Sequence, residues 1–526
     1  MNIYLIGMVI SFVVYLIIGF FISRKVKNAN DFYVAGRNAP VILIVGSMIA
    51  SYVSTGMFMG DAGEYYSGNF SPMTILATMQ VAGYILGAVF FGRYLRRSKV
   101  MTIPEFFGQR FCSEEVHKLA TITAIITMTV YLLSVVQGVG TLMHVVTNVN
   151  YNVCIILAVI VFSIVTVTSG SKGVLITDTL MFGVFTIALV LSVFVITETA
   201  GGWYSVVEQL NHFEIKNLLA WSGNLEYMYP TGFENVIWGI VYGIVWLSVC
   251  MVGPWQSSRY LMAKDEHTVV RSSLFSAFGI FVLQLMAGMA AVTVNLFHPE
   301  VESTSHVLIW AAMNILPPIL GVILLTGVLV AGISSATTFL SLIGASIAND
   351  IYRGKGNSIK VGRIAMIVVS IVVLLLAVFN PPQILWIMYF GGAIVASAWM
   401  PAALACILSK RVTKTGIFIG MLSGFIGCFA LKMYSNLFKV MLPVICDPVI
   451  IGIVLNAIGI IIGSALTQVT ETEKIAREKL FIIPDEEKDP LEMKKTLKYI
   501  SFTPLLGVIV TIILISIWVI PYMTSK

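Results

Sequence analysis

Hydroxyl-bearing side chains cluster within one apolar stretch of the chain, residues 331–341. Ser334, Ser335, Thr337 and Thr338 fall within five positions there, and helical spacing would place Ser334, Thr337 and Thr338 on neighbouring faces. A single serine in an apolar helix often bonds its own backbone and means little. Four hydroxyls together supply the hard oxygen ligands that a dehydrated monovalent cation needs. The pattern predicts a cation site in this helix.

An acidic residue, Asp178, lies inside another apolar stretch, in the sequence Leu175-Ile-Thr-Asp-Thr-Leu. A carboxylate inside a membrane helix costs about 2.5–3.5 kcal/mol on insertion scales, so its presence indicates a function. The alternative is an interfacial carboxylate that extends to the lipid headgroups beside Lys172. Two further acids, Asp61 and Glu64, follow an apolar stretch at its outer end, and we expect them to be solvated.

The composition defines the environment of these residues. Of 526 residues, 58% are hydrophobic and 11% are charged, with a mean hydropathy of +0.93, whereas soluble domains carry about 25% charged residues. Apolar windows of about 20 residues, long enough to cross a hydrocarbon core of about 30 Å, recur along the chain. We predict an all-α polytopic membrane protein, which excludes a soluble enzyme, a nucleic-acid binder and a disordered scaffold.

No pattern of residues indicates an enzyme or a bound cofactor. The six cysteines and six histidines show no zinc or disulfide spacing, and no P-loop is present. The net charge of +6 is assigned to basic loops at the membrane surface rather than to an anionic partner. The first twenty residues lack a basic region and a cleavage site, so we expect a retained span.

We predict about fourteen transmembrane helices. They are expected at residues 3–22, 40–66, 70–92, 118–147, 151–170, 174–198, 235–258, 273–297, 318–348, 362–380, 383–408, 415–437, 447–467 and 502–521. Basic residues, Arg259 among them, concentrate in alternate loops, which are therefore predicted to be cytoplasmic. Fourteen crossings then place both termini outside.

Two predicted spans are interrupted in corresponding ways. The second, residues 45–60, is dense in small and hydroxylated residues, and the seventh carries Gly253-Pro254. Five spans separate them, as expected if spans 2–6 and 7–11 are inverted repeats around a central transport site. The alternative is that the small residues only allow close helix packing.

These features give a predicted organisation in five parts. They are a leading helix with a cytoplasmic loop (1–37), the first repeat (38–200), an extracellular connection (201–234), the second repeat (235–411), and trailing helices with a cytoplasmic linker at 471–500 (412–526). The connection 201–234 and the segment 298–318 are expected to include short helices at the outer face.

Four motifs, in this order, resemble the sodium/solute symporter family. They are Asp31-Phe-Tyr-Val-Ala-Gly-Arg37, Thr177-Asp178, Gly253-Pro254 with Arg259 five positions later, and Ala331-x-x-Ser334-Ser335. The combination is specific, and the resemblance covers residues 1–468. It implies a leucine-transporter-type fold with two inverted five-helix repeats.

The resemblance implies two sodium sites and no other metal or cofactor. The first would use the carbonyls of Ala50, Val53 and Ala331 with the hydroxyls of Ser334 and Ser335. The second, present in some members, would use Asp178, Ser334, Thr337 and Thr338. This chain departs from the family pattern around the second site, with Ser169-Gly170 before Thr177 and with Met181 in place of a glutamine.

A central cavity is predicted from polar and aromatic residues on the interrupted spans and their neighbours. The candidates for substrate binding are Ser54, Thr55, Gln80, Gln137, Trp246 and Ser248. So few strong polar groups disfavour a sugar and favour a small carboxylate or an amino-acid-like solute. Trp246 matches a pocket tryptophan of the proline carriers, but Tyr52 replaces their aspartate, which argues against proline itself.

The sequence therefore predicts a sodium-coupled secondary symporter that imports a small organic solute across the cell membrane by alternating access. The alternatives are a proton-coupled carrier of the same fold and, less favoured, a channel. The hydroxyl-rich span favours sodium over protons. One or two sodium ions per cycle are both compatible with these residues. The partners expected are the solute, sodium and the lipid bilayer, without nucleic acid.

Overall fold

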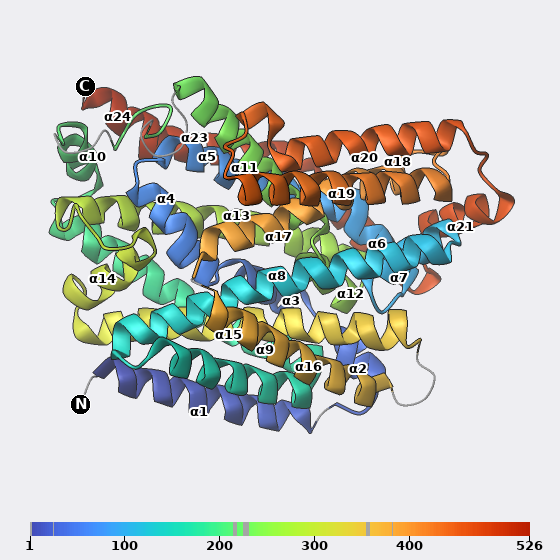
Figure 1. The fold of residues 1–526 in the computed structure, drawn as a ribbon, viewed down its shortest axis with the longest axis horizontal. Helices are drawn as coiled ribbons and strands as arrows, with labels where there is room; N and C mark the ends of the chain where they lie inside the picture. The colour runs from blue at the N-terminus through green and yellow to red at the C-terminus, as the bar shows by residue number, and fades with distance from the viewer. Residues whose placement is uncertain are drawn as a thin grey trace.

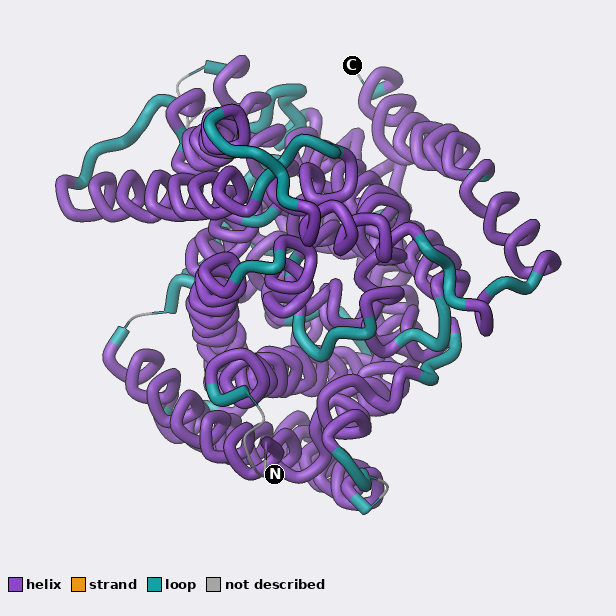
Figure 2. The backbone as a smooth tube through the Cα atoms, turned by 90° about the vertical axis from the view of Figure 1, so that its right-hand side faces the viewer, coloured by secondary structure: helices purple, strands orange, loops and turns teal. Residues whose placement is uncertain are grey.

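The computed structural model describes residues 3–24, 26–213, 218–224, 231–353, 358–380 and 382–525. Within these ranges the chain is helical, and its only β contact is an isolated bridge between Ala39 and Ala263. The long helices run along the long axis, and both ends of the chain lie at the same end of the bundle (Figure 1). Figure 2 shows the bundle from its opposite end.

The helices of the first half are α1 (Ile3–Ser23), α2 (Ala29–Val34), α3 (Val41–Tyr52), α4 (Ala62–Tyr66), α5 (Phe70–Gly87), α6 (Arg93–Ser98), α7 (Ile103–Phe111), α8 (Glu114–Thr147), α9 (Tyr151–Thr199) and α10 (Trp203–Asn211). Those of the second half are α11 (Gly232–Val252), α12 (Pro254–Met262), α13 (Glu266–Thr293), α14 (Val307–Asn314), α15 (Pro318–Ser346), α16 (Ser358–Phe379), α17 (Ile384–Ala398), α18 (Met400–Leu408), α19 (Lys414–Phe438), α20 (Pro448–Ala465), α21 (Glu471–Phe481), α22 (Pro490–Ser501), α23 (Thr503–Leu514) and α24 (Ile520–Thr524).

Among the described residues, twelve helices are long and apolar enough to span a membrane, or up to thirteen when the bent pair at 41–66 is counted as one span. The all-α membrane class is thus confirmed. The count is lower than the predicted fourteen partly because α9 is counted once. Its 49 residues would extend about 74 Å as a straight helix, but Gly170 breaks the helical geometry with φ 56° and ψ −157°.

The first interrupted helix breaks directly after Tyr52. Val53 has φ −75° and ψ 69°, and the Ser54 amide donates to the Tyr52 carbonyl at 2.8 Å. The carbonyl of Ala50 therefore loses its usual helical donor, the amide four residues later. The chain continues as a π-helix over Gly56–Asp61 and then as α4, at 45° to α3.

The second interruption separates α11 from α12 at Gly253, whose φ is −55° and ψ 131°. Pro254 begins α12, where its missing amide breaks no helical hydrogen bond. The segment before α3 is joined to the C-terminal end of α12, because the Ala39 amide donates to the Met262 carbonyl and the Lys264 amide donates to the Ala39 carbonyl, each at 3.0 Å.

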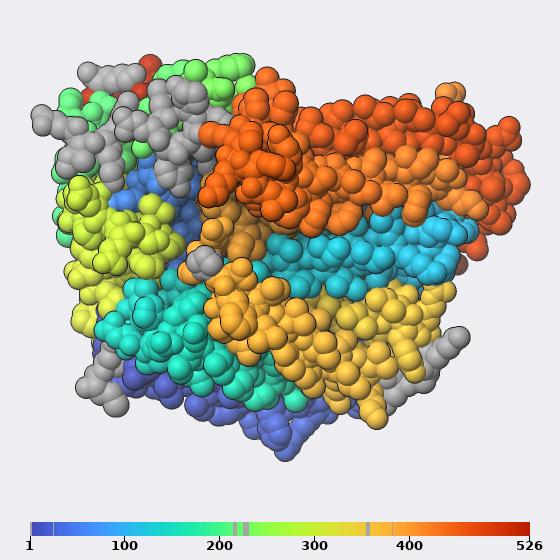
Figure 3. Space-filling view, viewed as in Figure 1, coloured from blue at the N-terminus to red at the C-terminus, as the bar shows by residue number. Residues whose placement is uncertain are grey.

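Helix α15 is central and contacts α1, α3, α8, α9 and α16. On the face seen in Figure 3, α8 lies between α16 and the helices α19 and α20. The short helices expected in the segments 201–234 and 298–318 are present as α10 and α14, although residues 214–217 and 225–230 lie outside the described ranges.

The predicted linker 471–500 forms α21 and α22, which pack against α6, α7 and α13. The Arg97 side chain donates to Glu266 at 2.6 Å and to the Leu480 carbonyl at 3.0 Å. The Glu266 amide donates to Glu487 at 3.0 Å. The linker is therefore part of the folded bundle rather than a free tether.

Close packing of α5 on α11 gives a test of the fold. A Cβ at Gly83 would lie 2.5 Å from the Leu247 carbonyl oxygen and 2.9 Å from its Cα, and backbone atoms cannot turn away. We expect Gly83→Ala to destabilise the protein by about 1–3 kcal/mol through overpacking, measured as a lower thermal unfolding midpoint in detergent.

The matched control is Gly183→Ala in α9, where no atom lies within 4 Å of the added Cβ. This change should leave the midpoint unchanged or raise it slightly, because alanine favours helix by about 1 kcal/mol over glycine. Equal loss of stability in the two variants would contradict the close approach of α5 and α11.

Candidate functional site

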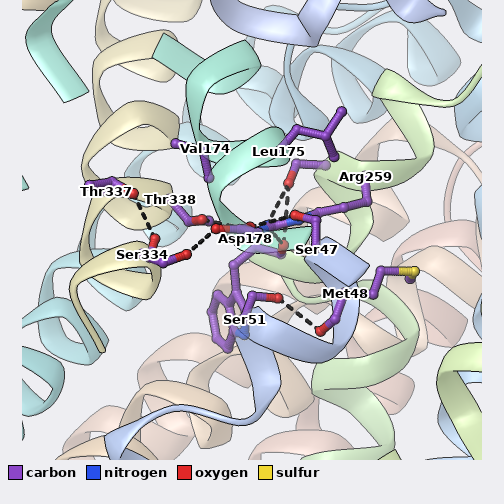
Figure 4. A network of polar contacts seen from close by, with 12 residues as sticks. Ser47, Met48, Ser51, Val174, Leu175, Asp178, Arg259, Ser334, Thr337 and Thr338 are labelled. Atoms are coloured by element: carbon purple, nitrogen blue, oxygen red, sulfur yellow. Dashed lines mark hydrogen bonds and ion pairs between the residues drawn. The ribbon is translucent and has the colours of Figure 1, made fainter. Parts of the chain in front are cut away.

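Asp178 lies on α9 at the centre of a fully buried polar network (Figure 4). Its carboxylate accepts hydrogen bonds from Ser47 of α3 and from Ser334 of α15, and it forms an ion pair with Nη2 of Arg259 at 3.0 Å. Four elements far apart in the sequence therefore meet at one carboxylate. The snorkelling alternative for Asp178 is wrong, because Lys172 pairs instead with Asp31 at 3.5 Å.

Arg259 projects from α12 into this network and is 1% exposed. Its Nε donates to the Ser47 hydroxyl and its Nη2 to the Thr338 hydroxyl, each at 3.0 Å, and Nη1 donates to the Trp255 carbonyl. The sequence assigned Arg259 to a cytoplasmic loop, and that assignment is wrong. The ion pair with Asp178 and these hydrogen bonds offset much of the free-energy cost of burying the guanidinium.

The structure brings three of the four predicted second-site residues together, Asp178, Ser334 and Thr338, around the Arg259 guanidinium. The Thr337 hydroxyl donates instead to the Ser334 carbonyl at 2.7 Å and lies 3.4 Å from the Tyr15 hydroxyl. A cavity of about 10 Å³ adjoins the network, and its lining residues include Ser47, Ser171, Thr338 and Ser341. That volume holds about one water molecule.

The residues predicted for the first sodium site come from two neighbouring elements, α15 and the broken end of α3. A Cβ at Gly332 of α15 would lie 2.9 Å from Thr55 Cγ2, so α15 contacts the broken segment directly. The Ser335 hydroxyl is buried and has no hydrogen-bond partner among the described residues. Ala331 lies one helical turn before Ser335. Ser334 differs from its neighbour, since its hydroxyl is held by Asp178.

Two of the six predicted substrate residues, Gln80 and Trp246, are brought together by Tyr52. Gln80 of α5 is hydrogen-bonded to the Tyr52 hydroxyl. Trp246 of α11 packs edge-on against the Tyr52 ring, with centroids 5.4 Å apart. Ser54 accepts a hydrogen bond from the Gly56 amide at 3.3 Å.

The other predicted substrate residues lie elsewhere or have other bonds. Thr55 is buried against α15. The Ser248 hydroxyl donates to the Ile244 carbonyl of its own helix at 2.7 Å. Gln137 donates to the Asn380 carbonyl at 3.3 Å and accepts from the Gln383 amide at 3.2 Å, so it bonds to the connection between α16 and α17.

Asp61 and Glu64 are not solvated, as the sequence suggested, but are each 1% exposed. Asp61 accepts hydrogen bonds from the Tyr242 hydroxyl at 2.8 Å and from Gln284 at 3.2 Å. Glu64 accepts from Asn69 at 2.9 Å. The bundle therefore buries carboxylates on both sides of the break in α3.

Curated relatives and solved structures resemble this chain over most of its length. The sodium/proline symporter of Escherichia coli (strain K12) is 23% identical over 496 residues, covering 87% of this chain and 93% of the relative. The sodium/pantothenate symporter of Haemophilus influenzae (strain ATCC 51907 / DSM 11121 / KW20 / Rd) is 22% identical, covering 75% and 84%. A Na+-coupled sialic acid symporter, solved in a substrate-bound outward-open state, matches with a TM-score of 0.73 at 17% identity, covering 89% of this chain and 99% of that structure.

The family described as "Sodium:solute symporter family" matches residues 32–424. That range contains both broken helices, the hydroxyl row of α15 and the Asp178–Arg259 pair. The chain belongs to the sodium:solute symporter family, whose members are transporters and not enzymes.

Proposed function

We propose that this protein uses the inward flow of sodium to import a small organic solute, a carboxylate or an amino-acid-like compound, by alternating access. The observation that carries the proposal is the contact between Thr55, just after the break in α3, and Gly332, just before the hydroxyl row of α15. Family membership supports sodium as the coupling ion. The relatives named for proline and pantothenate support a small organic solute.

The proposed topology has fourteen spans in the plasma or inner membrane, with two inverted repeats at 38–200 and 235–411. Dividing α9 at Gly170 would raise the thirteen candidate spans to fourteen. The paired breaks at Val53 and Gly253 support the repeats. The common end of the two termini supports an even number of crossings (Figure 1). We propose that both termini lie outside.

The first sodium ion would be bound by the carbonyls of Ala50, Val53 and Ala331 and by the hydroxyls of Ser334 and Ser335. Two observations support this set. The Ala50 carbonyl has lost its usual helical donor, and the Ser335 hydroxyl is buried without a partner in the described structure. Buried polar atoms of this kind are rare and suit a ligand that replaces the missing partner.

A second sodium ion would bind Asp178, Ser334, Thr337 and Thr338 only after Arg259 moves away. The guanidinium now neutralises Asp178, and a carboxylate shared by two cations in one small space would leave excess positive charge buried. Sodium and Arg259 would therefore compete for this carboxylate. The exchange would connect ion binding to movement of α12.

The energy available sets the accumulation that the transporter can sustain. Each charge moved is worth about 2.3 kcal/mol per 100 mV, and tenfold accumulation costs about 1.4 kcal/mol. For a solute without net charge, one sodium ion at 100 mV therefore supports about fortyfold accumulation from the voltage alone, and a second ion squares that factor.

The proposal is tested by uptake of a panel of labelled solutes into proteoliposomes with and without an inward sodium gradient. We expect uptake of at least one small solute to depend on the gradient and to be abolished by collapsing it. Uptake driven by a proton gradient without sodium would replace this proposal with a proton-coupled carrier, and gradient-independent conductance would indicate a channel.

The first site predicts the effect of removing the Ser335 hydroxyl. Ser335→Ala takes away one of about five oxygen ligands from a dehydrated ion, so the sodium concentration for half-maximal uptake should rise about tenfold. The control is Thr326→Val on the same helix, whose hydroxyl donates to the Val322 carbonyl at 2.7 Å. An unchanged sodium dependence in a well-expressed Ser335→Ala protein would place the ion elsewhere.

The second site predicts that removing Arg259 makes the protein depend on sodium for stability. Arg259→Gln leaves Asp178 buried without a counter-charge, a loss of about 3–5 kcal/mol, which sodium binding should partly restore. The thermal midpoint should therefore fall more in sodium-free buffer than in sodium. The double variant Asp178→Asn/Arg259→Gln should lose this sodium dependence. Equal falls in both buffers for Arg259→Gln would exclude sodium from the Asp178 site.

A further inference from the structure

Asp61 is a buried carboxylate that has no counter-charge. It is 1% exposed, and no basic side chain of the described residues lies within 4 Å of it, whereas Asp178 has Arg259 at 3.0 Å. Its two hydrogen-bond donors, Tyr242 and Gln284, are both neutral. Carboxylates inside membrane helices are expensive and typically belong to a substrate or ion path.

Asp61 retains capacity to bind a further donor. An ionised carboxylate offers about four lone-pair positions, and the two side chains take one on each oxygen. Close to it, the Gln284 carbonyl oxygen is also buried without a hydrogen-bond partner in the described structure. Acceptors therefore predominate at this point, which favours a ligand that brings donors and positive charge.

The backbone around Asp61 is irregular in a way that re-aims its side chain. The segment Gly56–Asp61 is π-helical, and the wider π-helical turn rotates the side chains at its end relative to their positions on an α-helix. Such bulges occur frequently at functional sites. Here the carboxylate reaches Tyr242 on α11 and Gln284 on α13, so elements of both halves of the chain converge on it.

Aromatic rings surround Tyr242, the residue whose hydroxyl donates to Asp61. Tyr242 stacks on Trp238 at 5.4 Å and on Tyr389 at 5.5 Å. Trp246 lies one turn further inward on the same helix, with its ring 6.3 Å from that of Tyr242, and its indole nitrogen is buried without an acceptor among the described residues. Aromatic faces beside a carboxylate are a recognised environment for organic cations. The indole donor suits an acceptor on the same ligand.

We propose that Asp61 binds the ammonium group of the transported solute, with Tyr242 and Gln284 holding the carboxylate in place. The solute is then an amino acid or another ammonium-bearing compound rather than a simple carboxylate. This inference rests on the proposed function and narrows its substrate class. It does not depend on which sodium sites are occupied.

The test uses matched pairs of solutes that differ only in the ammonium group. Proteoliposomes on a solid-supported membrane are exposed, with and without sodium, to the common α-amino acids and to γ-aminobutyrate, and to the deaminated partner of each, such as propionate for L-alanine. We expect sodium-dependent currents or labelled uptake with one or more ammonium-bearing solutes and none with their partners.

The responsible residue is tested with Asp61→Asn, Asp61→Glu and the control Glu64→Gln. Glu64 is an equally buried carboxylate on the next turn whose hydrogen bond comes from Asn69. Asp61→Asn should raise the half-saturation constant for the solute about thirtyfold or more, the lower range for truncating one member of a buried charge pair. Its half-saturation constant for sodium should change less than twofold. Asp61→Glu should recover most of the affinity, and Glu64→Gln should match the wild type.

Several outcomes overturn the inference. They are transport of a deaminated partner as well as its parent, an equal effect of Asp61→Asn on solute and sodium, and a panel in which no ammonium-bearing solute is carried. Proton-driven transport that Asp61→Asn abolishes would make Asp61 a proton carrier instead. Transport of ammonium-bearing solutes without sodium, still sensitive to Asp61→Asn, would keep the inference and overturn the proposed sodium coupling.

Discussion

A buried charge inside a membrane helix must be neutralised, and this constraint organises the centre of the bundle. Asp178 on α9 and Arg259 on α12 meet at 3.0 Å, and Ser47 on α3 is hydrogen-bonded to both. Through Ser47, the pair thus links α3, the first part of one broken helix, to α12, the second part of the other. Removing one partner of a buried ion pair is strongly destabilising, even where the intact pair adds little stability relative to an apolar core. Neither helix can therefore move unless another charge replaces the partner that leaves. A cation from solution is such a substitute.

The two sides of the break in α3 differ in charge balance. On one side, Asp178 has an internal cation and several hydroxyls. On the other, the donors to Asp61 among the described residues are neutral, and one of them, Tyr242, stacks on Trp238. A transporter that couples a charged solute to an ion needs one site whose charge the solute neutralises. It also needs a second site whose internal cation can be replaced by the coupling ion. The two carboxylates lie within one connected set of helices, in which α3 and α9 contact each other and both contact α13 and α15, and α5 joins α11 to α13.

The sequence predicted the helices and the two interruptions well, because their signals are local. Apolar length identifies spans, and Gly253-Pro254 identifies a break wherever the helix lies. It did not predict the depth of Arg259. An arginine near the end of an apolar run is normally assigned to the loop. Here the helix breaks at Gly253, and α12 after the break holds Arg259 buried inside the bundle. Asp61 was missed for a similar reason, since the π-helical register before it has no periodic sequence signal.

Neighbouring serines on α15 have different partners, and this difference suggests how two sites could communicate. Ser334 donates to Asp178, while Ser335, rotated about 100° around the same helix, is buried without a partner in the described residues. An ion that recruited the Ser334 hydroxyl would remove one of the hydrogen bonds that stabilise ionised Asp178. The ion pair with Arg259 would then supply more of the stabilisation of the Asp178 charge, or a second cation would replace Arg259. One turn of α15 would then connect the break in α3 to Arg259 on α12, without any requirement for long-range deformation.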